Sequence, residues 1–260
     1  MRAIDKKATL SIFFFLNALC FISQAQPSRF NNLKYISSKN DTLLYRLLEP
    51  DYNPSRKYPL VVFLHGSGES GSDNNAQLKW GVMNFATDQM MMSHPSFVLA
   101  PQCPANMAWP NITDLENLDN LRMSAKPSKP MKLVRELIAQ LVKNQPIDTN
   151  RIYITGVSLG GMGTFDAMMR YPDLFAAAVP VCGAGDLTKA STIKHIPTWI
   201  FHGAEDAAVD VKHTTEMINA LQKAGGNPGV TIYPEIGHFS WLGAYTDPLM
   251  IEWLYRQRKK

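Results

Sequence analysis

Short apolar runs alternate with amphipathic segments along most of the chain. The run Leu60–Leu64 is continuously apolar and stops at His65 and Gly66, a pattern typical of a strand buried on both faces. Further strands are predicted at 42–48, 97–100, 152–155, 176–181, 198–201 and 230–233. Helical spacing of apolar residues predicts helices over 131–142, 162–169, 217–221 and 248–256. Strands that alternate with helices predict a mostly parallel sheet with helices on both faces.

The N-terminal segment has the pattern of a secretory signal peptide. Positively charged residues precede an apolar run from Leu10 to Ile22, and the small residues Ser23 and Ala25 mark a cleavage site after Ala25. The run is shorter than the roughly 20 residues of a membrane-spanning helix, although an uncleaved anchor is the alternative. We therefore expect residues 1–25 to be removed and residues 26–260 to form a single domain. The mature protein is then secreted or periplasmic, without stable membrane association.

Composition restricts the partners and cofactors of this chain. It has 260 residues and a formal net charge of +4, part of which lies in the N-terminal segment and the C-terminal tail, so we expect no nucleic-acid partner. Without the N-terminal segment two cysteines remain, Cys103 and Cys182, which either form a disulfide or stay as buried thiols. No Cys and His spacing resembles a zinc site, so we expect no metal.

A candidate nucleophile lies in the segment Gly156–Gly160, which reads Gly-Val-Ser-Leu-Gly and is followed by another glycine. A β-branched strand precedes it and an apolar helical stretch follows it. This is the strand-turn-helix context in which a sharp turn raises a serine hydroxyl above a sheet. The pattern predicts that Ser158 is the nucleophile of a hydrolase.

A serine hydroxyl needs a base, and in this architecture the acid and then the histidine follow the serine along the chain. Asp206 follows the predicted strand 198–201, and His238 follows the last predicted strand, so both fall at the edge of the sheet where Ser158 lies. Asp206 is expected to orient the imidazole of His238. Glu205 and Asp210 remain alternatives for the acid.

The other histidines are not expected to transfer protons. His65 and His202 each precede a glycine at the end of a strand, where a histidine usually orders a loop through hydrogen bonds. His94, His195 and His213 fall in helix or loop segments and are expected to be solvated.

An oxyanion formed on the substrate needs backbone donors. One is the N–H of Leu159 at the start of the helix after the nucleophile, and the other comes from the loop after Leu60–Leu64. We predict the Ser67 amide as the second donor, with the Gly66 amide as the alternative.

Five segments carry a family resemblance: Leu64–Glu69, Gly156–Gly163, Tyr171–Ala177, His202–Asp206 and Gly237–Trp241. Together they resemble secreted single-domain esterases of the α/β-hydrolase fold, related to the feruloyl and acetylxylan esterases of carbohydrate esterase family one. The group is also similar to polyhydroxybutyrate depolymerases and to predicted peptidases related to prolyl oligopeptidases. The match covers the chain from about Leu60 to Leu254.

This resemblance implies the triad Ser158, Asp206 and His238 and ester hydrolysis through an acyl-enzyme without a cofactor. The implied substrates are small-molecule or polysaccharide esters, in particular acetyl or feruloyl groups on plant polysaccharide. A serine peptidase with the same fold is the alternative. A hydrolase fold used only for binding is disfavoured, because the triad and both oxyanion loops are present.

Three further residues are candidate substrate contacts. Trp109 and Trp241 can stack on sugar or aromatic rings, and Glu69 lies in the oxyanion loop. The sequence departs from the family pattern after the acid, where Val209 is followed by Asp210 instead of proline. This places an additional carboxylate near the predicted site.

Overall fold

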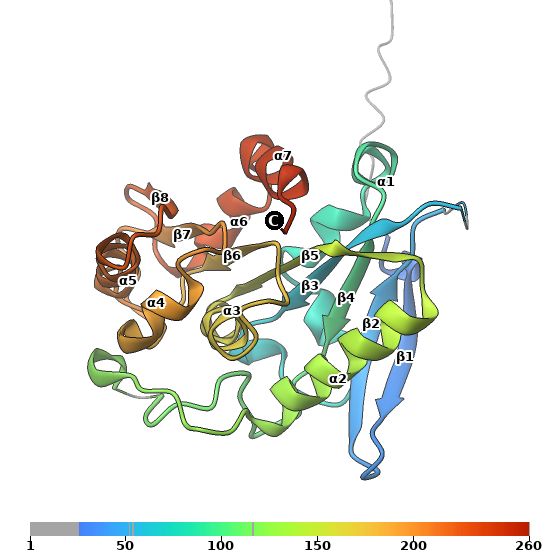
Figure 1. Ribbon diagram of the computed structural model, residues 1–260, viewed down its shortest axis with the longest axis horizontal. Coiled ribbons are helices and arrows are strands. Elements are labelled where there is room, and N and C mark those ends of the chain that lie inside the picture. The colour runs from blue at the N-terminus through green and yellow to red at the C-terminus, as the bar shows by residue number, and fades with distance from the viewer. Residues whose placement is uncertain (1–25, 52, 54, 116, 260) are drawn as a thin grey trace, which may run out of the picture.

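The computed structural model describes residues 26–51, 53, 55–115 and 117–259. The predicted signal peptide, residues 1–25, lies outside the described residues. In the described part, one sheet has the strand order β1-β2-β4-β3-β5-β6-β7-β8 (Figure 1). The strands are β1 Phe30–Ile36, β2 Thr42–Leu48, β3 Tyr58–Leu64, β4 Phe97–Pro101, β5 Ile147–Val157, β6 Ala177–Val181, β7 Trp199–Gly203 and β8 Gly229–Tyr233.

The sheet is parallel from β4 to β8, and β1 and β2 add antiparallel strands at one edge. The strands β3, β4 and β6 and the C-terminal part of β5, from Ile152 on, are continuously buried because helices cover both faces. The helices are α1 Asp88–Ser93, α2 Lys129–Asn144, α3 Leu159–Arg170, α4 Ala190–Ile193, α5 Lys212–Lys223, α6 Trp241–Ala244 and α7 Pro248–Arg256. The architecture is that of an α/β hydrolase.

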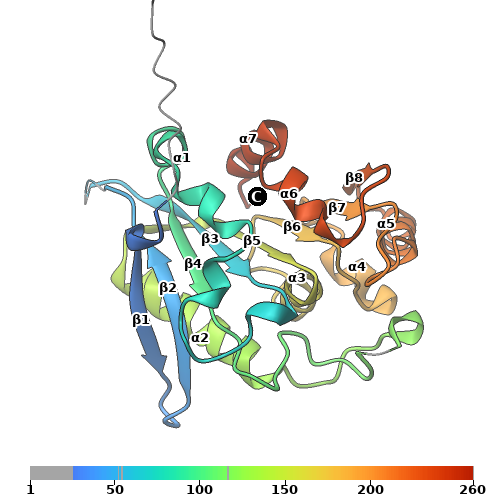
Figure 2. The same cartoon turned by 180° about the vertical axis from the view of Figure 1, so that it is seen from behind.

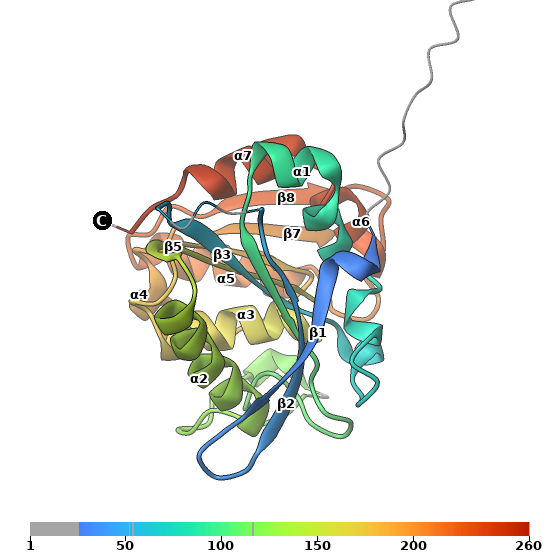
Figure 3. The same ribbon diagram turned by 90° about the vertical axis from the view of Figure 1, so that its right-hand side faces the viewer.

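Two hydrophobic cores lie on the two sides of the sheet. Side chains of α2, α3 and α5 form the first core with one face of the central strands, for example Leu137, Phe165 and Met217. The second core joins the other face to α6 and α7 through residues such as Tyr245 and Leu254. Figure 3 shows α7, α1 and α6 on one side of the sheet and α2 to α5 on the other.

The structure adds several features to the predicted elements. The edge strand β1 and the short helices α1, α4 and α6 were not predicted, and β5 begins at Ile147, five residues before the predicted strand. The segment 102–126 is an irregular excursion, whose described residues hold one 3-10 turn, Leu118–Asn120 (Figure 2). It reaches α5, where Lys212 pairs with Asp119 at 2.6 Å.

Each parallel strand ends at the same edge of the sheet, so the loops after β3, β5, β7 and β8 lie together there. These loops contain the predicted oxyanion, nucleophile, acid and base residues. Within residues 26–259, as far as they are described, no helix has both the length and the apolar character needed to cross a membrane.

Candidate active site

Ser158 occupies a sharp turn between β5 and α3. Its backbone has φ 55° and ψ −116°, a left-handed conformation that costs free energy for a residue with a side chain. After this turn α3 packs directly against β3, and only a glycine permits that close approach. A Cβ atom on Gly160 would collide with the Leu64 carbonyl oxygen. The serine side chain is therefore carried above the end of the sheet and remains partly exposed.

The structure brings Ser158, His238 and Asp206 into one hydrogen-bonded row. The Oγ atom of Ser158 lies 2.9 Å from Nε2 of His238, and Nδ1 of His238 lies 2.7 Å from Oδ2 of Asp206. A carboxylate accepts only, so Nδ1 carries the proton and Nε2 of the neutral ring is free to accept from the serine hydroxyl. This geometry can transfer the serine proton to His238.

Asp206 is fixed on both of its oxygens. Oδ1 accepts from the N–H groups of Ala208 and Val209 at 2.9 Å each, and Nε2 of His202 lies 3.3 Å from Oδ2. Burial acts to raise the pKa of Asp206, but the hydrogen bonds from His202, His238 and the Val209 amide outweigh it. The pKa of this carboxyl consequently lies below its ordinary value, and Asp206 stays ionised.

The two alternative acids are not in this row. The side chains of Glu205 and Asp210 are exposed. Asp210 instead accepts from the backbone N–H of Lys212 at the start of α5, at 2.8 Å. The additional carboxylate that the sequence places after Val209 is therefore exposed and bonded to the backbone at the start of α5, outside this row.

The structure confirms the loop-ordering roles of His65 and His202. His202 is fully buried and lies 2.7 Å from the Thr214 hydroxyl and 2.8 Å from the Val209 carbonyl oxygen. The prediction for His213 was wrong: its side chain is buried, because α5 packs that face beneath the excursion. Burial lowers the pKa of His213 below its ordinary value.

The predicted oxyanion donors lie on adjacent elements. Leu159 begins α3, so its N–H has no acceptor within the helix. Ser67 begins the 3-10 turn Ser67–Glu69 after β3, and that loop contacts the end of β5: a Cβ on Gly66 would lie 3.6 Å from the Val157 carbonyl oxygen. The loop that carries Ser67 therefore lies beside the end of β5, directly before Ser158 and Leu159 in the chain.

All three predicted substrate contacts are buried in the structure. Trp109 is 0% exposed, and its indole N–H donates to the His65 carbonyl oxygen at 3.0 Å, so its ring cannot stack on a substrate. Glu69 is also buried, because its carboxyl group turns inward toward the Gly66 backbone and the Trp80 indole. Burial raises the pKa of Glu69 above its ordinary value.

Trp241 is likewise buried, at 5% exposed, although its ring touches His238. Its ring meets that of His238 edge to face, with centroids 5.2 Å apart. The exposed ring beside the site is Phe239, which is 53% exposed and packs on Trp241 and on Trp80 at 4.8 and 5.7 Å. Phe239 was not predicted from the sequence, although its place directly after the predicted base was a usable signal.

Cys103 and Cys182 are both free, buried thiols. Burial raises the pKa of each to about 12. Among the described residues, Cys182, Asp206 and His238 form the one group of ligand-type atoms within 4.8 Å of one another. A metal there would have to displace the hydrogen bond between His238 and Asp206 and remove the proton of a thiol, so the group does not fit a resident metal.

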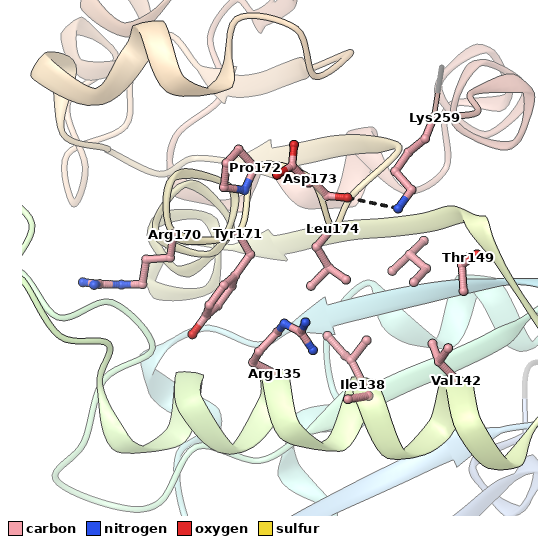
Figure 4. A pocket seen from close by; sticks show the side chains of 12 residues that line it. Arg135, Ile138, Val142, Thr149, Arg170, Tyr171, Pro172, Asp173, Leu174 and Lys259 are labelled. Atoms are coloured by element: carbon pink, nitrogen blue, oxygen red, sulfur yellow. Dashed lines mark hydrogen bonds between the residues drawn. The ribbon is translucent and has the colours of Figure 1, made fainter.

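A cavity of about 520 Å³ lies away from this row of residues. Figure 4 shows it between the α2 side chains Arg135 and Ile138, the segment Tyr171–Leu174 and Lys259. Thr149, near the start of β5, also lines it, so it is at the opposite end of that strand from Ser158. Because ligands of α/β sheets bind beyond the carboxyl ends of the strands, this cavity is not the catalytic cleft.

Comparison with known proteins identifies related sequences. Residues 49–246 match the family described as Phospholipase/Carboxylesterase. A thermostable esterase of known structure is 41% identical and superimposes with a TM-score of 0.83 over 89% of this chain. The present chain spans 64% of that esterase.

Two more relatives match the predicted resemblance. A bifunctional acetylxylan esterase/xylanase from Neocallimastix patriciarum is 26% identical over 57% of this chain, a match that spans 19% of that longer protein. A ferulic acid esterase of known structure shares the fold, with a TM-score of 0.66 and 16% identity over 87% of this chain and 98% of its own.

Proposed function

Because the chain belongs to the Phospholipase/Carboxylesterase family, we propose that it is a serine hydrolase of carboxylic esters that uses Ser158, His238 and Asp206 as its catalytic triad. The observation that supports this most directly is the row of two short hydrogen bonds that links the three side chains. In this proposal the enzyme works through a covalent acyl-enzyme and needs no cofactor.

In the acylation step, His238 Nε2 takes the proton of the Ser158 hydroxyl as Oγ attacks the ester carbonyl carbon. The carbonyl oxygen becomes an oxyanion, which accepts hydrogen bonds from the N–H groups of Ser67 and Leu159. The imidazolium is stabilised by the ionised Asp206. It then donates its proton to the alkoxide that leaves, and the acyl group remains on Ser158.

The deacylation step repeats this proton transfer with water. His238 removes a proton from a water molecule that attacks the acyl-enzyme, and the same two N–H groups hold the second oxyanion. The proton returns to Oγ of Ser158 as the carboxylic acid departs. The triad ends in its starting state.

The proposed substrate is a polysaccharide-derived or small-molecule ester with an acetyl or feruloyl group, met outside the cytoplasm after removal of residues 1–25. The exposed ring of Phe239 supports this choice. It directly follows His238 in the chain and is 53% exposed, so part of its ring is available to a sugar or aromatic ring.

The test is a substrate panel: p-nitrophenyl acetate, methyl ferulate, acetylated xylan and a proline-containing peptide. We expect hydrolysis of the esters, no hydrolysis of the peptide, and complete loss with Ser158→Ala. A fluorophosphonate probe should label the enzyme and not the Ser158→Ala variant. An unlabelled chain that hydrolyses no ester would refute the proposal, and cleavage of the peptide at rates above those of the esters would replace it with a peptidase.

A further inference from the structure

The predicted second oxyanion donor, the Ser67 N–H, lies in a loop in which separate hydrogen bonds fix successive peptide groups. In the peptide between His65 and Gly66, the carbonyl oxygen accepts from the Trp109 indole at 3.0 Å. The N–H of the same peptide faces the opposite way, toward the carboxyl group of Glu69. Gly66 is consequently engaged with Glu69, and its N–H is not available to an oxyanion.

In the next peptide, between Gly66 and Ser67, the carbonyl oxygen accepts hydrogen bonds, whereas the N–H does not donate one within the described residues. That oxygen lies 2.6 Å from Nδ1 of His65, on the buried side of the loop, and also accepts from the Glu69 N–H at the longer distance of 3.4 Å. Because C=O and N–H point in opposite directions across a trans peptide, the N–H of Ser67 is turned away from the buried imidazole. Among the described residues it donates to no other group, so it is free to donate to an oxyanion.

His65 can hold this carbonyl in only one tautomer. Nε2 accepts a hydrogen bond from the backbone N–H of Cys103 at 2.8 Å, so the proton must be on Nδ1, where the Gly66 carbonyl accepts it. The ring is 1% exposed and packs edge to face on Trp109 with centroids 5.0 Å apart. Burial lowers the pKa of His65 to about 4, so the ring stays neutral near neutral pH.

We propose, on the basis of the proposed esterase function, that His65 is a positioning residue for the oxyanion hole: its Nδ1–H turns the Gly66–Ser67 peptide so that the Ser67 N–H faces the transition-state oxyanion. Without His65 this carbonyl would keep only the longer hydrogen bond from the Glu69 N–H, and Gly66 lacks a side chain that restricts its backbone. Trp109 and Glu69, which hold the preceding peptide, assist the same arrangement.

Two variants of His65 separate its two hydrogen bonds. In His65→Asn the amide nitrogen lies where Nδ1 was, so the bond to the Gly66 carbonyl can persist while the bond from the Cys103 amide is lost. In His65→Gln the terminal oxygen lies where Nε2 was, so the bond from Cys103 can persist while the bond to Gly66 is lost. The two variants are therefore matched in size and polarity but differ in the bond that matters.

With p-nitrophenyl acetate we expect His65→Gln to lower kcat by about 10- to 100-fold with little change in KM, below the loss for deleting an oxyanion donor outright. His65→Asn should keep kcat within about threefold. The inhibition constant of an alkylboronic acid, whose adduct resembles the tetrahedral intermediate, should rise in parallel with the loss of kcat. Equal kcat values for folded wild type and His65→Gln would overturn the proposal, as would equal losses in both variants.

Nuclear magnetic resonance of histidine-labelled enzyme tests the tautomer of the His65 ring, and hence its hydrogen bond to the Gly66 carbonyl, without reference to activity. We expect the His65 ring to be protonated on Nδ1 and not on Nε2, and to remain neutral down to pH 5. A ring protonated on Nε2 would overturn the proposal even in an active esterase. A wild type that shows the expected tautomer but hydrolyses no ester would instead refute the esterase function and, with it, the catalytic role of this loop.

Discussion

Replacement of Asp206 by asparagine tests the triad at a single atom. Oδ1 of Asp206 accepts from two backbone N–H groups, of Ala208 and Val209, so the oxygen of an asparagine must stay on that side. The amide NH₂ then replaces Oδ2 and faces the rings of His202 and His238. To avoid two opposed donors, His238 must accept on Nδ1 and carry its proton on Nε2.

A His238 ring in that tautomer cannot accept the proton of Ser158. An acid-to-amide replacement of this kind lowers kcat by about 10⁴-fold, which corresponds to about 5 kcal/mol of activation free energy. We expect a loss of this order for Asp206→Asn. The NH₂ group also opposes the Nε2–H of His202, which is fixed by the Val209 carbonyl, so the variant should be less stable by about 1–3 kcal/mol.

The assay compares kcat for p-nitrophenyl acetate, with urea unfolding to confirm that Asp206→Asn is folded under assay conditions. Glu205→Gln and Asp210→Asn are matched controls, because each makes the same change at an exposed carboxylate in the same loop. Both should stay within about twofold of wild type. If Asp206→Asn loses less than tenfold while folded, or if either control loses as much, the assignment of the acid is wrong.

Three further predictions concern buried groups. Arg170→Met should lower the free energy of unfolding by about 3–5 kcal/mol, because it leaves the buried carboxylate of Asp166 without its ion-pair partner at 2.7 Å. Urea titration measures this change, and a loss below about 1 kcal/mol would contradict the prediction. A maleimide should leave Cys103 and Cys182 unmodified in the native protein and label both in guanidinium, since burial raises the pKa of each thiol to about 12. Rapid labelling of either cysteine in the native protein would contradict this prediction. Because burial lowers the pKa of His65 from 6.5 to about 4, the stability that its neutral ring contributes is present above pH 6.5 and is lost as the pH falls toward 4. That loss is about 3 kcal/mol for wild type and absent in His65→Asn, so equal pH dependence of their unfolding free energies would refute it.

The parts of the site that were predicted from sequence are those that a local pattern encodes. Ser158 was identified because a strand, closely spaced glycines and a helix are adjacent in sequence, and the turn they make is local. The choice among Glu205, Asp206 and Asp210 was less certain, since all three lie in one short loop. Only the hydrogen bonds of the folded loop show which carboxylate turns toward His238.

The parts that were missed depend on contacts between distant segments. The strand β1 lies at the edge of the sheet and is exposed at most positions, so it lacks the apolar pattern of a buried strand. Trp109 was expected to meet substrate, but its position depends on the path of the excursion 102–126, which has no periodic pattern. Glu69 was similarly misassigned, because its inward turn depends on Trp80, which approaches from another part of the chain.

At Ser158 the backbone conformation that the proposed catalysis requires lowers the stability of the protein. A left-handed conformation costs a serine or an alanine about 1–3 kcal/mol, whereas glycine adopts it with little strain. An inactive Ser158→Gly protein should therefore melt at a higher temperature than an equally inactive Ser158→Ala protein in the same calorimetric scan. A search for thermostable variants that ignores turnover would favour glycine at this position, and so would discard the nucleophile itself.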